Sequence, residues 1–236
     1  MKNRKKVLII TNVILVSVLI SVFAVMFLPT YSEPMYGGEE ISAIYSGNKN
    51  NKNVSFMFNV YENADVVEDI VSVLEKYGVK ATFFLGGCWA DDNEKTVLLI
   101  KNSGNEIANH GYYHKDHKNL DYQSNYNEIK NTDTLIKDIL GTNCNLFAPP
   151  SGSYSVDTLK ACCDLGYKVI MWSKDTIDWR DKEENKLFYR ATNQPTNGDL
   201  ILMHPKAHTL SILPSVIEYY KRLNFSIVTV SENISD

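Results

Sequence analysis

The sequence lacks several patterns that would assign it to a well-known functional class. No glycine-rich phosphate loop follows the first predicted strand, which argues against nucleotide binding, and no segment is repeated along the chain. The cysteines form no CxxC pair, so a cysteine-based zinc site has no spacing to support it. They are Cys88, Cys144, Cys162 and Cys163. A disulfide between two of them stays open, because an exported chain would meet an oxidising environment.

An excess of positive charge is also absent, because acidic residues outnumber basic ones in the chain. The formal net charge is −4, and removing the four positive charges of Lys2, Arg4, Lys5 and Lys6 leaves the remainder near −8. This balance argues against nucleic acid as a partner and leaves no basic patch for anionic lipid. The apolar content of 44% is ordinary for a chain of 236 residues that folds into one sizeable domain.

The N-terminus carries one long apolar run, Val7–Leu28, behind a basic flank. At 1.5 Å per residue a helix of this length can cross a hydrocarbon core of about 30 Å. We therefore predict a cytoplasmic flank at residues 1–6 and a transmembrane anchor at residues 7–28. The positive-inside rule then gives a single-pass protein of the cell membrane whose C-terminal domain is extracytoplasmic. The alternative is a cleaved secretion signal, whose apolar core is usually shorter.

Strand and helix signals alternate after a polar linker at residues 29–53. The predicted strands are residues 54–59, 81–85, 106–109, 146–148, 168–172, 200–203 and 225–230. The predicted helices are residues 67–77, 93–101, 124–140, 156–165, 183–192 and 213–223. This alternation predicts an α/β fold for residues 54–236, a distorted (β/α) barrel of about seven parallel strands. In such barrels the chemistry lies at the carboxyl ends of the strands, where Asn59, His110 and His204 are found.

The segment NHGYYH places two histidines, His110 and His114, four residues apart directly after a predicted strand. Two imidazoles at this spacing can converge on one metal ion, although the pattern alone is weak evidence. With its neighbours, the chain resembles the polysaccharide deacetylases (the NodB-homology group, carbohydrate esterase family four) over roughly Ile41 to Asn233. The resemblance implies a hydrolase that uses a divalent metal, zinc or cobalt, to remove N-acetyl groups from peptidoglycan or a similar glycan.

The resemblance fails at one group of motif residues. Asn59 stands at the position of the family's general base, and Val60 stands at the position of its metal-binding aspartate. Ala148 replaces the arginine that holds the base. An amide is not a useful proton acceptor and an isopropyl group cannot bind a metal. His110 and His114 are thus left without their third ligand, and no spacing rule selects a substitute among His117, Asp116, Glu62 and Asp65.

The other motif residues are retained. By resemblance His204 is the general acid, Asp178 is the partner that positions it, and Trp179 is one wall of the substrate site, together with the loop residues Pro150 and Ser151. The plainer interpretation of His204 and Asp178 is a pair of packed, hydrogen-bonded side chains. The segments FAPPSGSY and DTIDW resemble a sporulation-associated, deacetylase-like subgroup from Gram-positive spore formers.

Three functions remain open at this point. A working N-deacetylase would need a base from elsewhere, such as Asp175, Glu62 or a metal-bound hydroxide. A catalytically degenerate relative would keep the groove and bind peptidoglycan, another N-acetylated glycan or a morphogenetic partner. A membrane-tethered scaffold would bind no glycan at all.

Overall fold

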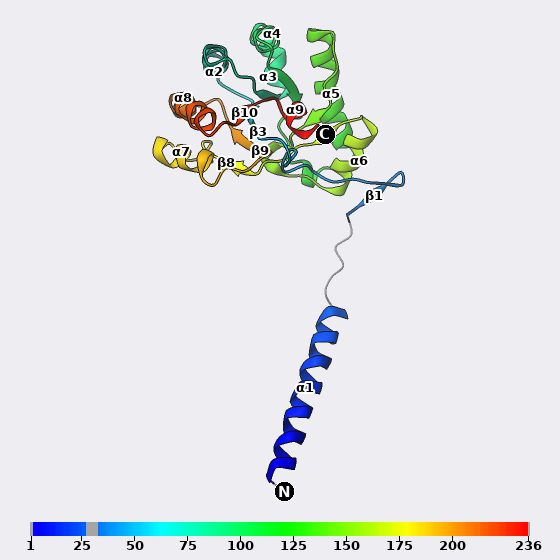
Figure 1. Cartoon of the computed structure of the whole chain (residues 1–236). Coiled ribbons are helices and arrows are strands. Elements are labelled where there is room, and N and C mark those ends of the chain that lie inside the picture. The colour runs from blue at the N-terminus through cyan, green and yellow to red at the C-terminus, as the bar shows by residue number, and fades with distance from the viewer. Residues whose placement is uncertain (1, 27–32, 236) are drawn as a thin grey trace. The chain divides into compact units, whose positions relative to one another are not determined.

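The computed structural model describes residues 2–26 and 33–235, and its contacts divide the chain into two units, residues 1–34 and 35–236. In the first unit, helix α1 (Lys2–Met26) contains the stretch Arg4–Phe23, with a mean hydropathy of 2.4 (Figure 1). By length and composition α1 can cross a membrane or serve as a secretion signal. Residues 27–28 of the predicted anchor and 29–32 of the predicted linker lie outside the described residues.

The second unit is built on a parallel sheet, as the sequence predicts. Its strands run in the order β7-β6-β5-β4-β3-β9-β8, with β10 also paired to β3. The strands are β3 (Asn53–Val60), β4 (Thr82–Leu85), β5 (Glu106–Asn109), β6 (Leu146–Phe147), β7 (Lys168–Val169), β8 (Lys174–Asp175), β9 (Asp199–Met203) and β10 (Ser226–Ile227). Within the described residues β7 and β8 are not paired with each other, so the curled sheet is an open, distorted barrel.

Helices surround this sheet (Figure 1). They are α2 (Ala64–Tyr77), α3 (Gly87–Asp92), α4 (Glu94–Asn102), α5 (Tyr122–Leu140), α6 (Val156–Asp164), α7 (Glu184–Thr192), α8 (Ala207–Arg222) and α9 (Val230–Ile234). Helix α2 shows why the sequence pattern works: its buried residues recur every three or four positions, and Gly78 ends it at a φ of 62°.

Two predicted strands differ from the structure. The strand predicted at residues 168–172 is paired as β7 only at Lys168–Val169. The strand predicted at residues 225–230 is shortened to β10, because Thr229 caps a helix that the apolar pattern does not predict. The Thr229 hydroxyl accepts a bond from the Glu232 amide, and the Glu232 carboxylate accepts one from the Thr229 amide. This reciprocal capping starts α9.

Alternation along β3 sorts its side chains between two apolar clusters. Phe56, Phe58 and Val60 pack with residues of α2 and α8 on the outer face of the sheet. Met57 packs on the inner face with residues of the neighbouring strands. Because successive side chains of a strand point to opposite faces, Asn59 lies on the inner face and Val60 on the outer one.

Part of the segment predicted as a linker packs on the domain. Residues 35–40 form a small antiparallel pair, β1 (Met35–Tyr36) and β2 (Glu39–Glu40). Ile44 then makes a parallel bridge to Ile170: the Ile44 amide donates to Val169 O and the Met171 amide donates to Ile44 O, both at 2.8 Å. This bridge extends the sheet beyond β7.

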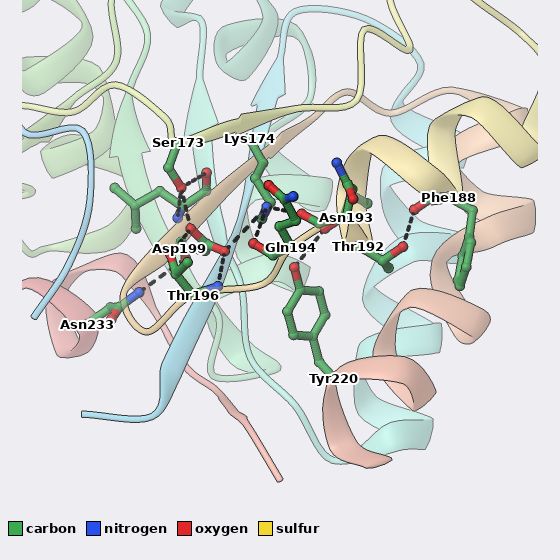
Figure 2. A network of polar contacts seen from close by, with 12 residues as sticks. Ser173, Lys174, Phe188, Thr192, Asn193, Gln194, Thr196, Asp199, Tyr220 and Asn233 are labelled. Carbon is green, nitrogen blue, oxygen red and sulfur yellow. Dashed lines mark hydrogen bonds and ion pairs between the residues drawn. The ribbon is translucent and has the colours of Figure 1, made fainter. Parts of the chain in front are cut away.

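A polar network at the start of β9 holds the edge strand β8 (Figure 2). The buried Asp199 carboxylate accepts bonds from the Ser173 hydroxyl at 2.9 Å and from the Thr196 hydroxyl and amide, each at 2.8 Å. Lys174 Nζ lies 3.6 Å from Asp199 Oδ2 and also donates to the carbonyl of Asn193. Strand β8 is only two residues long, so this network fixes the position of its carboxyl end and of the segment that follows.

Candidate functional site

A cavity of about 580 Å³ lies at the carboxyl ends of the strands. The register brings these ends level, since Val60 of β3 pairs with Leu85 of β4, and Leu85 pairs with Asn109 of β5. The cavity is lined by Asn59, Tyr61, Glu62, His110, His114, Ser151, Trp172, Asp175, Trp179, Leu202, His204 and Lys206. Motif residues far apart in sequence therefore meet at one mouth, where the family resemblance expects them.

His204 follows β9 and is bound to Asp178, which lies behind it. The imidazole Nδ1 is 2.7 Å from Asp178 Oδ1, and the His204 amide donates to Oδ2 at 2.7 Å. The Thr209 hydroxyl donates to the same Oδ2 at 2.6 Å. Burial opposes ionisation of Asp178, but the bonds from His204 and Thr209 outweigh it and lower the pKa of this carboxyl. A carboxylate in this position orients the ring and leaves its Nε2 toward the cavity side.

The segment before Asp178 is held in a strained turn. Ile177 has a φ of 55°, a left-handed conformation that a β-branched residue rarely adopts. The Asp175 carboxylate accepts a bond from the Ile177 amide at 2.7 Å, and the Arg190 guanidinium donates to Thr176 O at 3.0 Å. Burial raises the pKa of Asp175, which lines the cavity.

His110 directly follows β5 and is almost fully buried, with 2% of its surface exposed. Its Nδ1 lies 2.7 Å from the carbonyl oxygen of Ala148. Because a carbonyl only accepts, the ring proton is on Nδ1 and Nε2 is left as an acceptor. Burial, with the neighbouring His114 ring, lowers the pKa of His110 well below its usual range. Ala148 thus contributes its backbone, while its methyl group lies in the apolar interior.

His114 lines the cavity beside His110, and the two ring centroids are 5.2 Å apart. Its backbone has a φ of 54°, and burial lowers its pKa. The loop that carries it is held by a residue that sequence reasoning missed. The buried Glu128 of α5 accepts bonds from the amides of Tyr112 and Tyr113 at 3.0 and 2.7 Å. The only sequence signal for Glu128 is its place on the buried face of α5, next to Ile129.

Three of the third-ligand candidates named from the sequence are bonded to other residues, and the fourth lies on the surface. His117 is buried, with Nδ1 2.7 Å from Asn125 Oδ1. Glu62 lines the cavity but is paired with Lys206, and Asp116 bonds Ser153 and Asn119. Asp65 is exposed on α2.

The residues present therefore do not fit the implied zinc or cobalt ion. In the described part of the chain, no three His, Cys, Asp or Glu side chains gather closely enough to hold a metal. Val60, at the position of the missing carboxylate, is absent from the cavity lining and packs in the outer apolar cluster. Asn59 lines the cavity, but its buried Oδ1 has no hydrogen-bond partner. At these two positions the described structure thus presents an apolar side chain and an amide, neither of which is a carboxylate.

Aromatic side chains form the walls of the cavity. Trp172, Tyr61 and Trp179 line it, and Trp179 is 57% exposed, with the Arg180 guanidinium 5.7 Å from its ring. Ser151 also lines the cavity and has a φ of 56°. Pro150 is buried and is absent from the lining.

The family model for polysaccharide deacetylases matches residues 46–170, more than half of the chain. This chain belongs to the polysaccharide deacetylase family. The Bacillus subtilis protein YlxY is 34% identical over 80% of this chain and 59% of its own length. A peptidoglycan-N-acetylglucosamine deacetylase of Bacillus cereus is 26% identical over 81% of this chain and 72% of that protein.

The family also contains a solved structure described as a pseudoenzyme, BA3943 from Bacillus anthracis. It is 31% identical, with a TM-score of 0.81 over 84% of this chain and 70% of that one. A mutant of the same protein, described as having restored enzymatic activity, matches with 29% identity and a TM-score of 0.81 over 84% of this chain and 73% of that one. The deacetylase fold is therefore shared by enzymes and by a relative described as a pseudoenzyme.

Proposed function

We propose that this protein binds peptidoglycan strands without deacetylating them, and that α1 anchors it in the cell membrane with the domain outside. The observation that carries the proposal is the outward packing of Val60, which leaves two histidines without a third ligand. The exposed Trp179 and the other aromatic walls offer the apolar faces on which sugar rings pack. A spore-forming host and a cell-wall setting are suggested by the Bacillus relatives.

A working deacetylase is the competing function. His204 and Asp178 are arranged as an acid and its positioning partner, and Asp175 is a carboxyl within the same cavity. Removal of an acetyl group would nevertheless require a group that polarises the carbonyl and a base that activates water. Among the described residues no complete metal set supplies the first of these.

The two functions separate in one experiment. The full-length chain in detergent micelles is incubated with N-acetylglucosamine hexamer and with cell-wall peptidoglycan, with and without added zinc or cobalt. We expect bound glycan and no release of free amine. Amine release at a rate that depends on the added metal would establish the deacetylase and overturn the proposal. Absence of binding to any glycan would favour the scaffold instead.

The orientation of the chain is tested separately. A reporter that is active only outside the cytoplasm, fused after Asp236, should be active in cells. Activity of a cytoplasmic reporter at the same position would contradict an extracytoplasmic domain.

A further inference from the structure

The inner wall of the cavity is rich in hydrogen-bond acceptors. His110 presents Nε2 as an acceptor, because its Nδ1 donates to the Ala148 carbonyl and no carboxylate is bonded to the ring within the described residues. Asn59 is 5% exposed, and its Oδ1 has no partner although it is buried. One oxygen of Asp175 accepts from the Ile177 amide, and within the described residues the other oxygen makes no hydrogen bond or ion pair. The His110 Nδ1 donor is already bonded to Ala148, so the Asn59 amide nitrogen is the one remaining donor of these three side chains when Asp175 is ionised.

The positive charges around this wall are already paired. Among the described residues that line the cavity, Lys206 is the single member of the lysine and arginine types. It forms an ion pair with Glu62. His204 is bonded to Asp178. Within the described residues Asp175 forms no ion pair, and the two basic side chains that act on it, Arg190 and His204, are bonded to Asp181 and Asp178.

An acetamide is poorly matched to such a wall. Its carbonyl oxygen would find only the Asn59 amide nitrogen as a free donor among these three side chains, and the described residues contain no metal set to receive it. A primary ammonium is the opposite case, since it carries three N–H donors, a positive charge and no acceptor. The net charge of about −8 in the part that follows residue 6 also favours a cationic strand over a neutral one.

We propose that the cavity selects an amino sugar whose C2 amine is free, so that the protein binds glycan strands that an N-deacetylase has already processed. This proposal rests on the proposed glycan binding and names the sugar that the cavity takes. The ammonium lies between Asp175, Asn59 and His110, and the sugar ring lies against the aromatic wall.

The test compares glucosamine hexamer with N-acetylglucosamine hexamer, using full-length protein in detergent micelles and tryptophan fluorescence. Two of the three tryptophans, Trp172 and Trp179, line the cavity and report its occupancy. We expect the glucosamine hexamer to bind at least about tenfold more tightly, which corresponds to one paired charge of modest strength. The preference should survive EDTA. Hexalysine of matched charge should not displace the sugar, because it lacks the ring.

Substitutions locate the preference. Asp175→Asn keeps an oxygen for the Ile177 amide but removes the charge, and it should reduce the preference about tenfold. Asn59→Leu should reduce it as well, so the test does not depend on one variant. The matched control is Asp69→Asn, an exposed carboxylate on α2 that should leave the preference unchanged.

Each outcome has a clear meaning. Equal or tighter binding of the acetylated hexamer would overturn this proposal and leave glycan binding intact. A preference that appears only with added zinc would overturn it in favour of a metal-dependent site. Failure to bind either hexamer or any strand would reject the glycan-binding function itself.

Discussion

The two sides of the cavity mouth differ in how their side chains are held. On the side of His204, the buried carboxylate of Asp178 receives three bonds of 2.6–2.7 Å, and a left-handed Ile177 keeps the turn in place. On the side of β3, Asn59 has an unpaired buried oxygen and Val60 packs with apolar residues. Strained backbone persists only where surrounding bonds hold it. The His204 side thus holds a charge in position, and the β3 side does not.

Residue type alone therefore does not decide whether a side chain at the end of β3 reaches the cavity. A carboxylate at position 60 would begin on the face of β3 that packs against α2 and α8, among the residues of the outer apolar cluster. An aspartate at position 59 would instead face the cavity. An aspartate is therefore placed in the apolar cluster at position 60 but in the cavity at position 59.

The largest effect is expected for Val60→Asp. Placing an unpaired carboxylate in the apolar cluster should lower the free energy of unfolding by about 3–5 kcal/mol. Urea unfolding of the wild type and the variant measures the change. Asn59→Asp is the matched control, because the same side chain on the inner face borders the cavity and should cost less than it does at position 60. A Val60→Asp variant of wild-type stability that binds zinc would show that position 60 can reach the cavity.

The Asp178→Asn variant tests the His204 side of the cavity. Loss of the charge that accepts bonds from His204 and Thr209 should lower stability by about 1–3 kcal/mol at neutral pH. The folded pKa of Asp178 is below its unfolded value of about 3.9, so this contribution is present above that pH and is lost as the pH falls through the folded pKa. The difference in the free energy of unfolding between the wild type and the variant, measured by urea unfolding, should therefore shrink as the pH falls from about 6 to about 3. A constant difference would contradict the assignment.

The Glu128→Gln variant tests the support of the histidine loop. One acceptor oxygen is kept, while the ion pair with the half-exposed Lys115 at 2.9 Å is lost. We expect a loss of about 1 kcal/mol or less, because an exposed partner is screened by solvent. Hydrogen exchange should be faster at the Tyr112 and Tyr113 amides. Unchanged exchange at both amides would mean that Glu128 does not hold the loop.

The smallest effect on stability is expected for Trp179→Ala, since this side chain is largely exposed. The free energy of unfolding should change by less than about 0.5 kcal/mol. Glycan binding, by contrast, should fall, because the ring is a wall of the cavity. Tyr189→Ala removes another exposed aromatic, from α7 and outside the cavity lining, and should bind as the wild type does. Equal binding by all three proteins would place the glycan elsewhere.

Much of the architecture follows from local pattern. The spacing of Val67, Ile70, Val71 and Leu74 predicts α2, and the short apolar runs predict the parallel strands, because burial of one face is visible in the order of residues. The pairing of Ile44 with Ile170 is not visible in that way, since it depends on an unfilled sheet edge more than a hundred residues away. The start of α9 is likewise set by the capping contacts of Thr229.

The same division holds for the site. The motif residues predict the family, the place of the cavity, and an amide and an apolar side chain at positions 59 and 60, because the chemistry of a side chain is known from its residue type. Only the tertiary structure decided that Val60 points away from the cavity, that Asn59 keeps an unpaired oxygen, and that Glu128 supports the His114 loop. These are contacts between distant segments. They arise when the strands align in register and the pleat assigns each side chain to one face of the sheet.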